Sequence, residues 1–171
     1  MEIAARYLAT RPRTRWELER RLRKAAAERA VIDSTLERLA GLGYVDDAAF
    51  AGWWSEQRDR HAPRGRRLLE AELRQHGVPR DVIEALREAD ADAAAGPEPD
   101  DSAERLPETE EERAKIALDR HLRGRPLPTD AAALQRVGMF LVRRGFDPET
   151  VRRTLRRAAE GSELPSEASE D

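Results

Sequence analysis

One short pattern occurs at two places in the chain and limits its possible folds more than any other feature. Residues 77–83 (Gly-Val-Pro-Arg-Asp-Val-Ile) parallel residues 145–151 (Gly-Phe-Asp-Pro-Glu-Thr-Val). In both copies a glycine suited to end a helix is followed by residues suited to begin another. A first copy is expected around Ala26, where the spacing to Ile32 matches the other two. The pattern predicts repeated helical units joined by tight turns.

Helical periodicity surrounds these turns, and no stretch alternates in the manner of a strand. Residues 14–17 (Thr-Arg-Trp-Glu) form a capping-box pattern that predicts the start of a helix. Asp46 is the expected cap of a second helix, whose broad apolar face contains Phe50, Trp53 and Trp54. We interpret that face as core or repeat-to-repeat packing, with partner binding as the alternative. The sequence therefore predicts an all-α fold.

Composition decides between one deep core and several thin ones. Leu, Ile, Val and Phe together supply 32 of the 171 residues, too few for a single deep core. We therefore expect three tandem three-helix repeats at residues 1–45, 46–87 and 110–159. Residues 88–109 are predicted to be a flexible acidic linker and residues 160–171 a disordered acidic tail.

Charge is segregated along the chain, although the formal net charge is only -3. Residues 88–112 hold eleven acids and one base, and residues 160–171 hold five acids and no base. The remainder has 30 basic and 18 acidic side chains, which favours a polyanionic or acidic partner. Solvation of helix faces in an arginine-rich chain is the alternative. The acidic stretch is either a passive tether or a competitor that folds back on the basic body.

Several classes of function are disfavoured. The absence of cysteine excludes disulfides and thiolate chemistry, and no apolar run is long enough for a membrane span. The N-terminus lacks a signal-peptide pattern, so a cytoplasmic location is expected. His61, His76 and His121 do not have metal-ligand spacing, and helix capping explains Asp46 and Asp47. We predict no catalytic, cofactor-binding or metal-binding residues, and hence no enzyme.

The candidate binding residues are arginines in the loops between the first and second helix of each repeat, together with the last helix. The loop residues are Arg13, Arg15, Arg64, Arg66, Arg67, Arg123 and Arg125, and the helix residues are Arg152, Arg153, Arg156 and Arg157. Clusters of this kind suit phosphate or acidic protein surfaces, and a solvated helix face is the alternative. Trp16 lies away from its helix's apolar stripe, which leaves partner contact or packing over its own helix end.

Several of these stretches resemble the RecX family, bacterial regulators of the RecA recombinase. Residues 14–22, residues 39–51 (Leu-Ala-Gly-Leu-Gly-Tyr-Val-Asp-Asp-Ala-Ala-Phe-Ala) and residues 143–146 (Arg-Arg-Gly-Phe) carry the resemblance. It covers about residues 3–158 outside the acidic stretch. Ala26 stands where the family usually has glycine, and the acidic insertion is unusually long.

The resemblance implies an elongated, curved stack of three-helix repeats. It implies binding to the RecA–DNA filament and restraint of its recombinase, ATPase and co-protease activities, in DNA repair and the SOS response. The arginines above would contact RecA or single-stranded DNA, directly or within the filament. No cofactor and no membrane are implied, and a monomer is expected. A helix-turn-helix transcriptional regulator is the alternative, and a purely structural adaptor is a third hypothesis.

Overall fold

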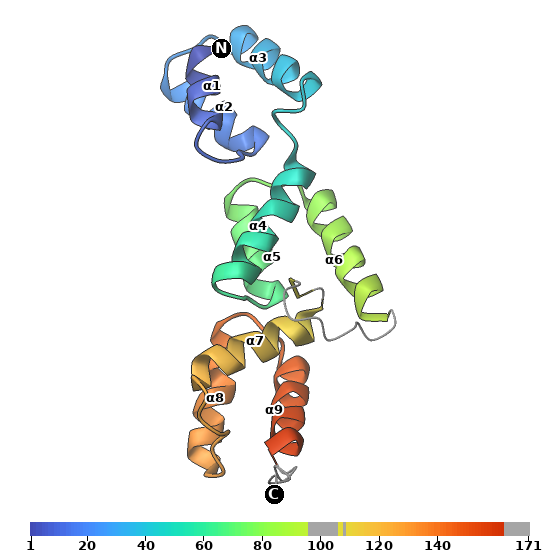
Figure 1. Ribbon diagram of the computed structural model, residues 1–171. Coiled ribbons are helices and arrows are strands. Elements are labelled where there is room, and N and C mark those ends of the chain that lie inside the picture. The colour runs from blue at the N-terminus through green and yellow to red at the C-terminus, as the bar shows by residue number, and fades with distance from the viewer. Residues whose placement is uncertain (96–105, 108, 163–171) are drawn as a thin grey trace, which may run out of the picture. The chain divides into compact units, whose positions relative to one another are not determined.

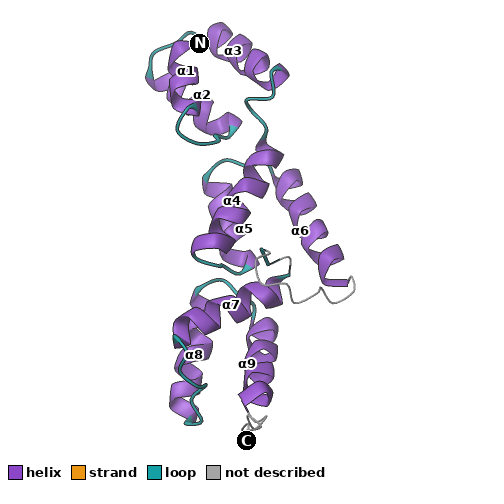
Figure 2. Cartoon of the chain, viewed as in Figure 1, coloured by secondary structure: helices purple, strands orange, loops and turns teal. Residues whose placement is uncertain are grey.

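The computed structural model describes residues 1–95, 106–107 and 109–162, and within these ranges the chain forms helices and no strands (Figures 1 and 2). The all-α prediction is confirmed. The helices are α1 (Glu2–Leu8), α2 (Arg15–Lys24), α3 (Arg29–Gly41), α4 (Asp47–His61), α5 (Arg66–Gln75), α6 (Arg80–Ala95), α7 (Glu110–Leu122), α8 (Ala131–Arg143) and α9 (Pro148–Ser162). In chain order they form repeat 1 (α1–α3), repeat 2 (α4–α6) and repeat 3 (α7–α9).

The contacts divide the chain into two compact units. Unit 1 consists of residues 1–57 and 70–89, and unit 2 consists of residues 58–69 and the described residues from 90 onward. Each unit contains a place where one repeat meets the next. The first junction, between repeats 1 and 2, lies in unit 1, and the second junction, between repeats 2 and 3, lies in unit 2.

Helix starts follow the capping chemistry that the sequence predicts. The Glu17 amide donates to Thr14 Oγ1 at 3.1 Å and the Thr14 amide donates to Glu17 Oε2, which completes the predicted capping box. Asp46 Oδ1 accepts from the amides of Ala48 and Ala49 at 2.9 Å each. These bonds satisfy amides that have no partner within the helix.

The three predicted helix-ending turns share one geometry. Ala26, Gly77 and Gly145 have φ angles of 54°, 75° and 91°. In each turn the next amide donates five residues back, from Ala27 to the Leu22 carbonyl, from Val78 to the Leu73 carbonyl and from Phe146 to the Leu141 carbonyl. This is the Schellman pattern, for which glycine is the preferred residue. The predicted first copy at Ala26 is confirmed, with an alanine held in the left-handed region.

Buried apolar side chains form separate clusters instead of one deep core. One cluster in repeat 1 includes Leu18, Leu22 and Leu36, and another in repeat 3 includes Leu118 and Leu141. Repeat 2 buries Phe50, Leu73 and Ile83. The prediction of several thin cores is confirmed.

The boundaries predicted for the acidic segments need correction. Helix α6 continues to Ala95, so residues 88–95 are helical and are not part of a flexible linker. Alanine favours helix in this stretch, and Asp90 is held by an ion pair to Arg113. Helix α9 continues to Ser162, past the predicted tail start at residue 160. The other residues assigned to linker and tail, 96–105, 108 and 163–171, lie outside the described part of the chain.

Candidate functional site

The first junction is built on the N-terminal end of α2. The Thr14 hydroxyl donates to the His76 carbonyl at 2.6 Å, in the turn that ends α5. The Arg15 amide donates to Asp47 Oδ1 at 2.8 Å, at the start of α4. Asp47 therefore satisfies an unpaired amide of α2 while lying in the first turn of α4, where a negative charge is also favourable.

Glu17 is the centre of the charged contacts at the first junction. Its side chain is 9% exposed and accepts from Arg11 Nη2 at 2.8 Å, and its Oε1 lies 3.0 Å from His76 Nδ1. Burial alone would raise the pKa of Glu17, but the hydrogen bonds from Arg11 and His76 outweigh burial and lower it. The Glu17 carboxylate is therefore a structural group that holds repeat 2 against α2.

The second junction repeats this plan with different side chains. The Gly65 amide donates to the Arg144 carbonyl at 3.0 Å, as the Thr14 hydroxyl does to the carbonyl before Gly77. The Arg66 amide donates to Glu110 Oε1 at 3.1 Å, at the start of α7. A Cβ atom at Gly65 would collide with the backbone of Gly145, so only glycine permits this close approach.

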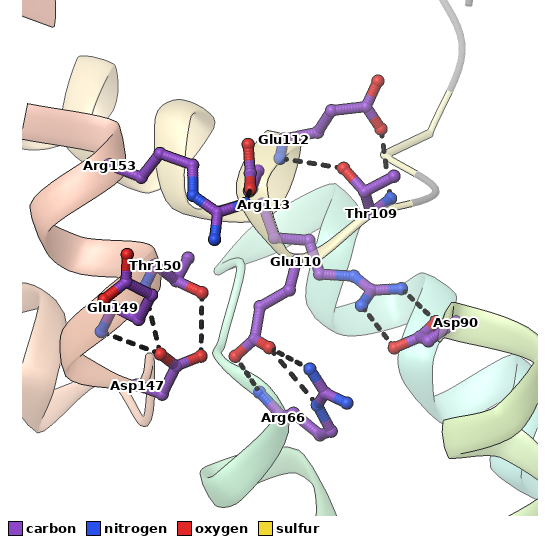
Figure 3. Close-up of polar contacts among 11 residues, drawn as sticks. Arg66, Asp90, Thr109, Glu110, Glu112, Arg113, Asp147, Glu149, Thr150 and Arg153 are labelled. Carbon is purple, nitrogen blue, oxygen red and sulfur yellow. Dashed lines mark hydrogen bonds and ion pairs between the residues drawn. The ribbon is translucent and has the colours of Figure 1, made fainter. Parts of the chain in front are cut away.

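Arginine–carboxylate pairs reinforce the second junction (Figure 3). The Arg66 guanidinium donates to Glu110 Oε2 at 2.6 and 3.2 Å, and this bond raises the pKa of Arg66. Arg113, 4% exposed, donates to both carboxylate oxygens of Asp90 at 2.8 and 3.0 Å and to Asp59 at 3.2 Å. Burial lowers the pKa of Arg113, but the two aspartates outweigh burial and raise it.

Arginines of the last helix also meet carboxylates. Arg153 and Arg157 both pair with Glu111 of α7, the latter at 2.9 Å. Arg152 pairs with Glu149 one turn earlier in α9. Arg156 is exposed. Two acids of the predicted acidic stretch, Glu110 and Glu111, thus lie against three arginines that the sequence assigns to filament binding.

The loop arginines differ in how tightly they are held. Arg13 lies 4.0 Å from the Tyr7 ring centroid and donates to Thr10 Oγ1 at 2.9 Å. Arg64 is half-buried, and burial together with the nearby charges of Arg58 and Arg144 lowers its pKa. Of the arginines predicted in loops, Arg15 lies in the first turn of α2, and Arg66 and Arg67 lie in the first turn of α5, because these helices begin at Arg15 and Arg66. The exposed members of the predicted set are Arg15, Arg67, Arg123 and Arg125.

Trp16 packs against repeat 2 instead of over its own helix end. A Cβ atom at Gly77 would lie 2.5 Å from the Trp16 Cβ, so the tryptophan rests directly on this turn. The Arg20 guanidinium lies 5.2 Å from the Trp16 ring centroid. Trp16 is still 41% exposed, and partner contact stays a prediction.

The broad apolar face of α4 takes part in internal packing. Phe50 is 1% exposed, and Trp54 Nε1 donates to Glu72 Oε2 at 2.9 Å. The His76 ring meets Trp54 edge-on, with 4.3 Å between the ring centroids. These contacts agree with the packing interpretation of this face.

A groove in repeat 3, here called the α8 groove, contains residues that sequence reasoning missed. It lies between the end of α7, the following loop and α8, and has a volume of about 860 Å³. Its lining includes Leu122, Arg125, Arg136, Met139, Phe140 and Arg143. The groove face could have been found from the sequence, because the spacing of its α8 residues places them on one side of a helix. These residues are Arg136, Met139, Phe140 and Arg143.

The part of the chain that the structure describes contains no group of three or more histidine or carboxylate side chains suited to a metal ion. Among the same residues, no helix is both long and apolar enough to cross a membrane. Asp46 and Asp47, the adjacent carboxylates of the sequence, are occupied with helix capping.

These features define a class of protein, the tandem three-helix repeat proteins with arginine-rich loops. Three family models match the chain: "RecX, first three-helix domain" at residues 1–39, "RecX, second three-helix domain" at 46–86 and "RecX, third three-helix domain" at 108–155. The chain belongs to the RecX family of regulatory proteins.

Named relatives agree with this assignment, and a solved structure shares the fold. The chain is 39% identical to "Regulatory protein RecX" of Mycobacterium ulcerans (strain Agy99), over 84% of this chain and 75% of the relative. It is 36% identical to the protein of the same name from Thermobifida fusca (strain YX), over 95% of this chain and 80% of the relative. The crystal structure of RecX from Lactobacillus salivarius has the same fold, with a TM-score of 0.71 and 15% identity over 92% of both chains.

Proposed function

We propose that this protein is a non-enzymatic regulator that binds the RecA–DNA filament and restrains its recombinase, ATPase and co-protease activities. Its membership of the RecX family carries the proposal, through 39% identity to a protein named as a regulator. The proposed role belongs to DNA repair and the SOS response. It requires no cofactor and is performed by a cytoplasmic monomer.

The arginine environments indicate which side chains would meet the filament. Arg66 and Arg113 are held by carboxylates at the second junction, so they support the fold. Arg67, Arg123 and Arg156 are exposed and suited to phosphate. We therefore assign the contacts with the polyanion to these three arginines.

The physical basis of restraint is differential binding to two states of the filament. A ligand shifts an equilibrium only by as much as it prefers one state over the other. Hydrolysis requires the recombinase to pass between states. A regulator whose guanidinium groups fit only one of them therefore slows the cycle.

The decisive experiment measures RecA ATPase activity on single-stranded DNA, with and without this protein. The proposal predicts reduced hydrolysis at stoichiometric amounts. Unchanged hydrolysis at excess would contradict it. A transcriptional regulator would instead give a sequence-selective footprint on duplex DNA, and a structural adaptor would give neither result.

A triple variant tests the exposed arginines. Replacing Arg67, Arg123 and Arg156 by alanine should weaken filament binding and flatten its dependence on salt. Each lost phosphate contact should change the log–log slope by roughly 0.7 to 0.9. Arg38→Ala/Arg87→Ala, at exposed positions of α3 and α6, is the control. Inhibition by the triple variant equal to that of the wild type would contradict the assignment.

Competition by the acidic stretch is a separate part of the proposal. Its described ends already place Asp90, Glu110 and Glu111 on arginines. Replacing residues 96–105 by neutral Gly/Ser of equal length removes further acids and spares these pairs. Tighter filament binding at low salt, with a gain that shrinks as salt rises, would support competition. Equal affinity at every ionic strength would leave only a tether.

A further inference from the structure

The α8 groove combines one sign of charge with an apolar floor. Arg125, Arg136 and Arg143 line it, and no carboxylate of the described residues does. All three arginines are exposed, so their charges are available to a molecule that enters the groove. The groove is therefore complementary to an acidic occupant.

Aliphatic and thioether groups form much of the remaining lining, beside polar and aromatic side chains. Met139 is 45% exposed and lines the groove, as do Leu122, Pro126 and Val137. A large thioether left this exposed on a helix face adapts readily to an apolar side chain of a partner. Arginine and methionine are also enriched at protein interfaces.

The aromatic ring of the groove is unsuited to stack a nucleotide base. His121 stacks on Phe140 with 3.9 Å between ring centroids and an interplanar angle of 17°. The Arg144 guanidinium lies over the same Phe140 ring, 4.8 Å from its centroid. The Phe140 ring therefore already has two partners from within repeat 3. A nucleotide base, which usually anchors single-stranded nucleic acid by stacking, would have to compete with these partners for the ring, and this disfavours a nucleic-acid occupant.

We propose that the α8 groove binds a protein segment that carries acidic side chains beside at least one aliphatic side chain. The guanidinium groups of Arg136 and Arg143 pair with its carboxylates, and Met139 covers its aliphatic group. This inference rests on the proposed function and deepens it, because it adds a contact to the protein part of a filament to the contacts with phosphate.

The test uses the full chain and a fluorescein-labelled peptide of about twelve residues composed of Glu, Asp and Leu, with binding measured by fluorescence anisotropy at low and high salt. Arg136→Glu/Arg143→Glu should weaken binding at least about tenfold, with a loss that shrinks at high salt. Met139→Ser should weaken it about threefold at both salt concentrations, because its contact is apolar.

Arg38→Glu/Arg87→Glu is the matched control, since it changes the net charge equally at exposed sites on other helices. Its affinity should stay within about twofold of the wild type, because neither Arg38 nor Arg87 lines the groove. Equal losses for the two double variants would overturn the proposal, as would an unchanged affinity of Met139→Ser.

Two further measurements address other occupants. Displacement of the peptide by oligo(dT), with the same dependence on Arg136 and Arg143, would make the groove a nucleic-acid site and overturn the proposal. A tenfold tighter peptide affinity after removal of residues 163–171 would identify the chain's own end as the occupant and overturn it as well. Failure of the chain to restrain RecA hydrolysis would contradict the proposed function, whereas peptide binding decides the groove independently.

Discussion

The two junctions solve the same problem with the same backbone geometry. In both, the N-terminal end of a repeat's second helix donates to the carbonyl that precedes a left-handed glycine of the next repeat. In both, the first amide of that helix donates to the first residue of the next repeat's first helix, an acid, from Arg15 to Asp47 and from Arg66 to Glu110. The open amides of a helix start are thus satisfied by the neighbouring repeat.

The side chains that support this geometry differ. The first junction uses the Thr14 hydroxyl and a Glu17 carboxylate held by Arg11 and His76. The second uses the bare backbone of Gly65 and the buried charge of Arg113. The comparison shows that the backbone arrangement is the common element. The stability of the first junction should therefore fall when Glu17 is protonated at acid pH. The stability of the second should depend on the close backbone approach at Gly65 and on the ion pairs of Arg113.

The largest expected effect comes from Arg113→Met, which leaves Asp59 and Asp90 without their buried partner. Breaking such a pair costs about 3–5 kcal/mol of unfolding free energy. Chemical denaturation followed by circular dichroism measures the whole chain, while tryptophan fluorescence reports only unit 1, which contains all three tryptophans. Because Arg113 lies in unit 2, the loss of unfolding free energy should appear in the transition followed by circular dichroism.

Lys115→Ala is the control for this prediction, because Lys115 lies in the same helix and forms an exposed pair with Asp119. It should change stability by less than about 1 kcal/mol. Equal destabilisation of the tryptophan transition by Arg113→Met would show that the junctions do not respond separately.

Gly65→Ala should open the second junction, because the added methyl group collides with the Gly145 backbone. Overpacking of this kind costs about 1–3 kcal/mol. Gly52→Ala makes the same change within α4, where nothing lies within 4 Å, and should stabilise the helix by about 0.5–1 kcal/mol. The prediction fails if both variants shift the denaturation midpoint in the same direction.

Glu17→Gln tests the acid dependence of the first junction. The folded state lowers the pKa of Glu17 below its ordinary value of 4.5, so its contribution is present above that value and lost as the pH falls through the folded pKa. Burial raises the pKa of Asp47, which opposes this trend. The variant should cost about 1–3 kcal/mol near neutral pH and flatten the acid decline of stability measured by tryptophan fluorescence.

Glu19→Gln is the matched control, because Glu19 forms an i,i+4 pair with the exposed Arg23 of the same helix. It should leave the acid decline unchanged. An acid decline of equal steepness in Glu17→Gln and the wild type would contradict the role assigned to Glu17.

The smallest expected effect is a gain in stability. Ala26→Gly removes the cost of a left-handed alanine, and should stabilise unit 1 by about 1 kcal/mol. Ala40→Gly, at an exposed position inside α3, should instead destabilise by about 0.5–1 kcal/mol. A loss of stability in Ala26→Gly would mean that the alanine side chain contributes more than its backbone strain costs.

Local chemistry made much of the fold predictable. The capping box at Thr14 and Glu17, the cap at Asp46 and the three helix-ending turns each depend on a few neighbouring residues, so their patterns were sufficient. The family assignment likewise depended on contiguous stretches. The end of α6 was predicted too early because acidic composition indicates disorder. The contact that holds this part of α6 joins Asp90 to Arg113 across 23 positions, so no local pattern indicates it.

The roles of the arginines show what only the tertiary structure decided. The sequence by itself determined that the chain is all-α, built of three repeats and rich in clustered arginine. It could not separate Arg66, which is bound to Glu110 across 44 positions, from its exposed neighbour Arg67. Helix periodicity specifies which face a side chain occupies, but the partner on that face comes from a distant segment. Pairing across such distances depends on how the repeats meet, and that is a property of the folded chain alone.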